Sequence, residues 1–210
     1  MKLHRATKKP DWAKVARARR NAWQRVANTT KGSVTPGNIL TIVGLAITTV
    51  GLVAVVQRQY SLAVAALLVG RLFDLLDGWV ADKTGTKGPV GELLDASIDK
   101  LEVLAALIIL YFTSVVPAWA IVALAWPHVW IALIVVTKHM QRQRLHPSRL
   151  GKVSMALAWF AIGGFVLVKV LHGSVADVCS VVSYALTLSS LILGVRAAWS
   201  YSYVTHKKQL

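Results

Sequence analysis

Six long apolar stretches constrain the fold of this chain more than any other feature of its sequence. They lie near residues 38–57, 61–81, 93–114, 116–137, 153–171 and 176–200. Each is long enough to cross the hydrocarbon core of a bilayer, which takes about 20 apolar residues. Only 16% of the residues are charged, against roughly 25% in soluble domains. Because a backbone in hydrocarbon must satisfy its own hydrogen bonds, the sequence predicts an all-α integral membrane protein with six transmembrane helices.

Little chain remains outside these stretches for a second globular domain. We expect a basic cytoplasmic segment over residues 1–37, one transmembrane domain over 38–204 and a cytoplasmic tail over 205–210. Thr35 or Asn38 is expected to cap the first spanning helix. The single cysteine, Cys179, cannot form an intrachain disulfide.

The formal net charge of +15 raises nucleic-acid binding as an alternative, and the placement of the cations argues against it. Ten of the 24 Lys and Arg precede residue 38, and a second group lies between the fourth and fifth stretches. The opposite loops hold few cations, chiefly Arg58, with Lys169 near a helix end. This positive-inside pattern places both termini in the cytoplasm. We therefore predict a protein of the cell membrane whose partner is lipid and not nucleic acid.

The basic segment from Asp11 to Ala27 reads DWAKVARARRNAWQRVA, with Trp12 and Trp23 set among arginines. Such a composition predicts an amphipathic helix that lies on anionic headgroups, with its tryptophans at the interface. The alternative is a topology signal with no further role.

Acidic residues are concentrated in one short part of the chain. Seven of the nine fall between positions 74 and 102, and they are Asp74, Asp77, Asp82, Glu92, Asp95, Asp99 and Glu102. Asp74 and Asp77 are three apart, whereas Asp95 and Asp99 are four apart, so each pair shares one face of its helix. Two helices joined by a short connector run antiparallel and adjacent. These four aspartates are thus predicted to surround one point near the cytoplasmic side.

Four carboxylates inside a membrane need compensation, because together they would cost on the order of 10 kcal/mol on insertion scales. A divalent cation removes both this cost and their mutual repulsion. With hard oxygen ligands, Mg²⁺ or Mn²⁺ fits better than zinc, and its open positions suit a diphosphate. Gly78, Ala81 and Gly91 would let a ligand approach the backbone closely, although tight helix–helix contact explains such small residues equally well.

Residues 74–99 read DLLDGWVADKTGTKGPVGELLDASID. This segment resembles the signature of the CDP-alcohol phosphotransferase family, D-x-x-D-G-x-x-A-R followed after eight residues by G-x-x-x-D-x-x-x-D. Every fixed position matches except one, since Asp82 stands where the family has arginine. The family's six spans and interfacial amino-terminal helix agree with the hydropathy pattern. The resemblance also implies a homodimer.

The resemblance implies roles for the motif residues. Asp74, Asp77 and Asp95 would bind the metal, Asp99 would complete the site and act as general base, Gly78 and Ala81 would contact the nucleotide, and Gly91 would leave room for it. Asp82 would lie at the nucleotide-binding position and bring an anion near the phosphates. This negative charge would weaken binding of the substrate, change which donor is used, or be neutralised by Lys83 or Lys87.

The reaction implied by the resemblance is transfer of a phosphatidyl group from CDP-diacylglycerol to a small alcohol, with release of CMP. A phosphorylated alcohol needs a cationic pocket, for which the candidates are Lys138, Arg142, Arg144, Arg149, Lys152 and Arg196. The strings LLDASIDKLEV and SRLGKVSMAL look like the phosphatidylglycerophosphate synthase branch, so glycerol 3-phosphate is the predicted acceptor and inositol phosphate the alternative.

Two other functional classes remain open. Intramembrane acids also line ion paths in transporters, although transporters spread such acids over both halves of the chain. The other class is a non-catalytic relative that binds nucleotide or lipid without turnover. Asp82, the departure from the motif, would be the feature that indicates it.

Overall fold

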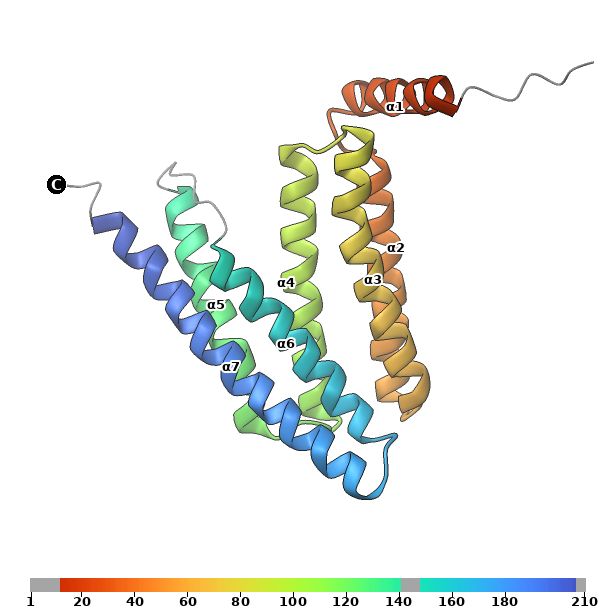
Figure 1. The fold of residues 1–210 in the computed structure, drawn as a ribbon. Coiled ribbons are helices and arrows are strands. Elements are labelled where there is room, and N and C mark those ends of the chain that lie inside the picture. Colours follow the sequence, from red (N-terminus) through yellow and green to blue (C-terminus); the bar gives the residue numbers. More distant parts are fainter. Residues whose placement is uncertain (1–11, 141–147, 207–210) are drawn as a thin grey trace, which may run out of the picture. The chain divides into compact units, whose positions relative to one another are not determined.

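The chain is all-helical throughout the part that the structure, a computed structural model, describes (Figure 1). That part comprises residues 12–140 and 148–206, with side chains described except for residues 12–17, 89–90, 92–97, 138–139 and 202–206. The helices are α1 (Trp12–Thr29), α2 (Pro36–Val56), α3 (Tyr60–Thr84), α4 (Pro89–Phe112), α5 (Ala118–Met140), α6 (Arg149–Val168) and α7 (Gly173–His206).

The helices fall where the apolar pattern predicts them, with one helix, α2 to α7, on each apolar stretch and α1 on the basic amphipathic segment. Within the described residues, four helices are long and apolar enough to cross a membrane, namely α2, α5, α6 and α7. The acid-bearing helices α3 and α4 have 25 and 24 residues, or roughly 36 Å at 1.5 Å per residue. The all-α class is confirmed, whereas six spans and an interfacial α1 remain predictions.

Large apolar side chains face outward along these helices. Leu75, Phe112 and Phe160, for example, are 73%, 79% and 65% exposed. Soluble monomers rarely expose apolar patches beyond a few hundred Å². The outer surface of the helices therefore suits lipid and not water.

By internal contacts the chain forms two compact units, which we describe separately. The first comprises Met1–Gly44 and Arg71–Ser97, and the second Leu45–Gly70 and Ile98–Leu210. The first unit thus holds α1, the beginning of α2, the end of α3 and the beginning of α4. It carries most of the acidic cluster.

A short turn in the first unit joins α1 to α2. Gly32, with φ of 84°, donates its N–H to the Ala27 carbonyl over 2.7 Å and closes the end of α1. The Thr35 hydroxyl accepts the Asn38 N–H over 3.1 Å and caps α2, with Pro36 at the first helical position. The Asn38 side chain donates to the Gly32 and Ser33 carbonyls over 3.1 and 3.0 Å. Thr35 is therefore the cap, and Asn38 holds the turn.

Small residues bring the helices of the second unit together. A β-carbon at Gly194 of α7 would lie 2.5 Å from Pro127 Cβ of α5 and 2.8 Å from Ser154 Oγ of α6. The Ser154 hydroxyl donates to the Ser190 carbonyl over 2.8 Å, and the Ser190 hydroxyl donates to the Ser154 carbonyl over 2.9 Å. Close backbone approach and interhelical hydroxyl bonds are the contacts that hold helices together in membranes.

Candidate functional site

Asp77 is the most enclosed of the carboxylates described in the first unit, with only 5% of its surface exposed. The hydroxyl of Thr41, on α2, donates to Asp77 Oδ2 over 2.6 Å. This contact forms because α2 and α3 lie side by side there: a β-carbon at Gly37 would be 3.0 Å from the Ala81 β-carbon and 3.1 Å from the Asp77 carbonyl oxygen. A short bond from a neutral donor to a carboxylate is stronger than an ordinary hydrogen bond, so it helps to hold the Asp77 side chain in place.

Asp74 lies one helical turn before Asp77 and has a cationic neighbour. Arg71 Nη1 is 3.1 Å from Asp74 Oδ2, and the two side chains are 21% and 25% exposed. The spacing of three residues puts both on one face of α3. Asp74 and Asp77 thus form a pair of carboxylates on one helix, with a hydroxyl against the second and a guanidinium against the first.

The other two predicted ligands are on α4. Asp95 is in the first unit, and its side chain lies outside the described set. Asp99 is partly buried and belongs to the second unit. Among the side chains described, no three acidic, histidine or cysteine groups gather closely enough to hold a metal ion. Convergence of the four aspartates on one point therefore remains a prediction.

The three small residues of the motif differ in their surroundings. A β-carbon at Gly78 would meet no atom of the described residues within 4 Å, which leaves room there for a ligand. Ala81 packs against Gly37, and a β-carbon at Gly91 would lie 3.0 Å from Asn38 Oδ1. Helix contact, the alternative considered for these residues, accounts for the latter two, and their role toward a nucleotide stays a prediction.

Asp82, the departure from the family motif, lies near the end of α3 and faces water. Its carboxylate is 3.3 Å from Lys87 Nζ, with the side chains 61% and 54% exposed. Exposed pairs of this kind contribute roughly 0–1 kcal/mol. Lys83 turns elsewhere, with its ammonium 5.0 Å from the centre of the Trp79 ring. Of the two lysines that would offset Asp82, Lys87 is the one paired with it.

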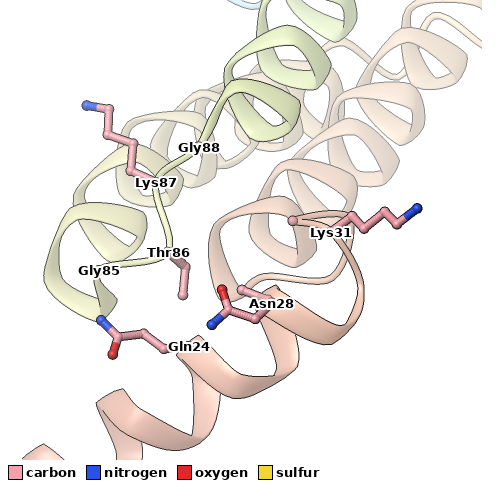
Figure 2. A pocket seen from close by; sticks show the side chains of 9 residues that line it. Gln24, Asn28, Lys31, Gly85, Thr86, Lys87 and Gly88 are labelled. Carbon is pink, nitrogen blue, oxygen red and sulfur yellow. The ribbon is translucent and has the colours of Figure 1, made fainter.

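The connector between α3 and α4 rests against α1. A cavity of about 300 Å³ lies between them, lined by Gln24, Ala27, Asn28, Lys31, Gly32 and residues 85–88. Figure 2 shows Gln24, Asn28 and Thr86 around this hollow, while Lys31 and Lys87 extend away from it. Gly85, with φ of 64°, is covered closely: a β-carbon there would be 2.8 Å from Gln24 Nε2. Its positive φ favours glycine at this turn.

The candidate acceptor cations belong to the second unit, and three of them lie at one end of the α6–α7 pair. A β-carbon at Gly151 would be 3.8 Å from Ala197 Cβ, and the Ser148 N–H donates to the Tyr201 hydroxyl. These contacts bring the beginning of α6, which carries Arg149 and Lys152, beside the turn of α7 that carries Arg196. All three are exposed. Arg142 and Arg144 lie outside the described residues, as does the side chain of Lys138.

Two residues of this site were missing from the expectations, Thr41 and Arg71. The spacing of Arg71 and Asp74 was a usable signal, because residues three apart on a helix are neighbours. Thr41 is separated from Asp77 by 36 residues, and nothing local in the sequence connects them.

The oxygen donors of Asp74 and Asp77 are of the kind that a divalent cation prefers. Asp74 and Asp77 offer carboxylate oxygens from one helical face, and Mg²⁺ is commonly bound through one or two carboxylates plus substrate phosphates. The guanidinium beside Asp74 shows that a cation is accommodated at this carboxylate. The open face at Gly78 leaves access next to the pair.

Most of the chain matches a known protein family. A family model described as CDP-alcohol phosphatidyltransferase matches residues 34–201, from the turn before α2 to the last part of α7. The matched region contains the whole acidic cluster. No curated protein matches the chain significantly.

Proposed function

The chain belongs to the CDP-alcohol phosphatidyltransferase family, and from this premise we propose that it is a metal-dependent enzyme that transfers a phosphatidyl group from CDP-diacylglycerol to a small phosphorylated alcohol. Family membership carries the general reaction, transfer from a CDP-alcohol to an acceptor in phospholipid biosynthesis, and the membrane setting. The buried Asp77 beside Asp74, inside the matched region, supports the metal.

We place Mg²⁺ or Mn²⁺ among Asp74, Asp77, Asp95 and Asp99. When bound, the ion would neutralise charge on the diphosphate of the donor. Thr41 supports this assignment, because its bond to Asp77 Oδ2 orients the carboxylate.

The proposed chemistry is a single displacement. Asp99 accepts the proton of the acceptor hydroxyl, the hydroxyl oxygen forms a bond to the phosphorus attached to diacylglycerol, and the bond from that phosphorus to the CMP oxygen breaks. CMP leaves with the electron pair. The nucleotide lies along Gly78, whose face is open, near Ala81, Asp82 and Gly91.

The proposed acceptor is glycerol 3-phosphate, with inositol phosphate as the alternative. The gathering of Arg149, Lys152 and Arg196 at one end of the α6–α7 pair supports a phosphorylated acceptor, because a phosphate monoester is bound best by several cations together. The same residues also satisfy the positive-inside rule, so an acceptor screen has to separate the two explanations.

The proposed topology follows from charge. We propose six spans in one domain over residues 38–204, with α1 on the membrane surface, both termini cytoplasmic and a homodimer as the assembly. Reporter fusions at each terminus and the mass of the protein in lipid nanodiscs would test these points.

The test of function is acceptor-dependent release of CMP from CDP-diacylglycerol by purified protein in lipid with Mn²⁺. Asp77→Asn should abolish release. Asp177→Asn is the matched control, because Asp177 is an exposed acid on α7 outside the cluster, and its activity should equal that of the wild type. Absence of acceptor-dependent CMP across glycerol 3-phosphate, inositol phosphate, serine and inositol would favour a binding protein. Ion flux through sealed vesicles without CMP release would favour a transporter.

A further inference from the structure

Arg71 is a charged residue that neither the motif nor the proposed reaction uses. It lies near the middle of α3 (Tyr60–Thr84), one turn before Asp74. A cation inside a spanning helix is costly unless it is paired or reaches the interface. Apart from Asp74, the sequence around it, VGRLFD, is apolar. Its presence therefore needs a reason within this part of the protein.

Its contact suggests that reason. The guanidinium Nη1 lies 3.1 Å from Asp74 Oδ2, with about a fifth to a quarter of each side chain exposed. Asp77, the neighbouring acid, is held by the Thr41 hydroxyl from α2. Asp77 thus accepts a hydrogen bond from a neutral hydroxyl, and Asp74 contacts a full positive charge on its own helix.

We infer that Arg71 and the divalent ion are alternative partners of the Asp74 carboxylate, an inference that rests on the proposed function. Without metal, the guanidinium neutralises Asp74. With metal, the ion takes the oxygen, because Mg²⁺ carries two charges and binds carboxylate oxygen at 2.0–2.1 Å, well inside the 3.1 Å of the guanidinium contact. Arg71 then turns away on its flexible stem.

Arg71 is accordingly a positioning residue that sets the metal affinity. It keeps the proposed ligand oriented in the empty protein, and it weakens metal binding because the ion must displace it. The opposite role, in which Arg71 orients Asp74 permanently and strengthens metal binding, predicts the reverse sign when Arg71 is removed.

The test measures Mn²⁺ binding directly, by the loss of the free-ion electron paramagnetic resonance signal, on purified protein in nanodiscs without substrate. Arg71→Gln should lower the Mn²⁺ dissociation constant about tenfold. Lys83→Gln is the matched control, because it removes one positive charge from the same helix at an exposed position over Trp79, and its constant should stay within about twofold of the wild type. Arg71→Lys carries a more strongly hydrated charge. Its dissociation constant should lie between those of Arg71→Gln and the wild type.

A second readout is thermal unfolding. Without metal, Arg71→Gln should unfold at a lower temperature than the wild type, and saturating Mn²⁺ should raise its midpoint by more than it raises that of the wild type. An unchanged or larger dissociation constant in Arg71→Gln overturns the inference and leaves the proposed function standing. If Arg71→Gln does not fold, Arg71→Lys provides the test. A Mn²⁺ dissociation constant of Arg71→Lys at or above the wild-type value overturns the inference. Absence of Mn²⁺ binding in the wild type removes both this inference and the metal site.

Discussion

The bond between Thr41 and Asp77 makes the most direct prediction about the site. Thr41→Val removes the hydroxyl and keeps the shape of the side chain. The bond spans 2.6 Å, and the two residues are only 6% and 5% exposed, so water replaces the lost donor poorly. Hydrogen bonds to charged groups contribute about 1.5–3 kcal/mol. We therefore expect the metal-free protein to lose about 2 kcal/mol of unfolding free energy.

The catalytic efficiency should fall by the same free energy when metal is limiting. About 2 kcal/mol corresponds to roughly a thirtyfold decrease in kcat/KM, since 1.4 kcal/mol is tenfold. Saturating Mn²⁺ should recover part of it, because a bound cation also stabilises the carboxylate. The assays are CMP release over a Mn²⁺ titration and thermal unfolding without metal.

Two variants control this experiment. Thr49→Val makes the same change on the same helix, where the hydroxyl is exposed and donates only to the Leu45 carbonyl, so its effect should stay within about 0.5 kcal/mol. Thr41→Ser retains the hydroxyl and should behave as the wild type. Equal effects of Thr41→Val and Thr49→Val would refute the reasoning, and a serine variant as poor as valine would show that the hydroxyl alone does not account for the loss.

Three further predictions follow from the geometry. Asp77→Asn should reduce Mn²⁺ binding and CMP release to background, measured on the same preparation, and ordinary activity in this variant would exclude the metal site. Asp82→Arg should tighten binding of CDP-diacylglycerol, seen as a lower KM at constant kcat, because it exchanges an anion for a cation at the proposed nucleotide site; a raised KM would mark Asp82 as a specialised contact. Gly194→Ala should lower the unfolding free energy by about 1–3 kcal/mol through overpacking against Pro127, whereas Gly163→Ala, with nothing within 4 Å, should not, and equal melting temperatures would contradict the packing.

The positions of all seven helices could be predicted from the sequence. Apolar length and amphipathic spacing are local properties, and in hydrocarbon the helix is one of the few ways for a backbone to satisfy its own hydrogen bonds. A cap at Thr35 or Asn38 was predicted for the same reason, and the structure shows that Thr35 is the cap, through a bond between residues three apart. Even the pairing of Asp74 and Asp77 on one face follows from helical geometry alone.

The roles of the small residues could not be read in this way. Gly78, Ala81 and Gly91 look alike in the sequence, yet only Gly78 has an open face, while Ala81 meets Gly37 and Gly91 meets Asn38. Which of them faces a ligand depends on where the beginning of α2 lies, and Gly37 and Asn38 precede the motif by more than 30 residues along the chain.

The sequence by itself therefore determined the helices, the segregation of charge and the family motif, because each depends on spacing within one segment. Only the tertiary structure decided that Thr41 donates to Asp77 and that Gly37 closes over Ala81. Both contacts join α2 to α3 across more than thirty residues. The physical reason is that a hydroxyl and a carboxylate, or two small side chains, carry no mark of their partner until packing brings their helices together.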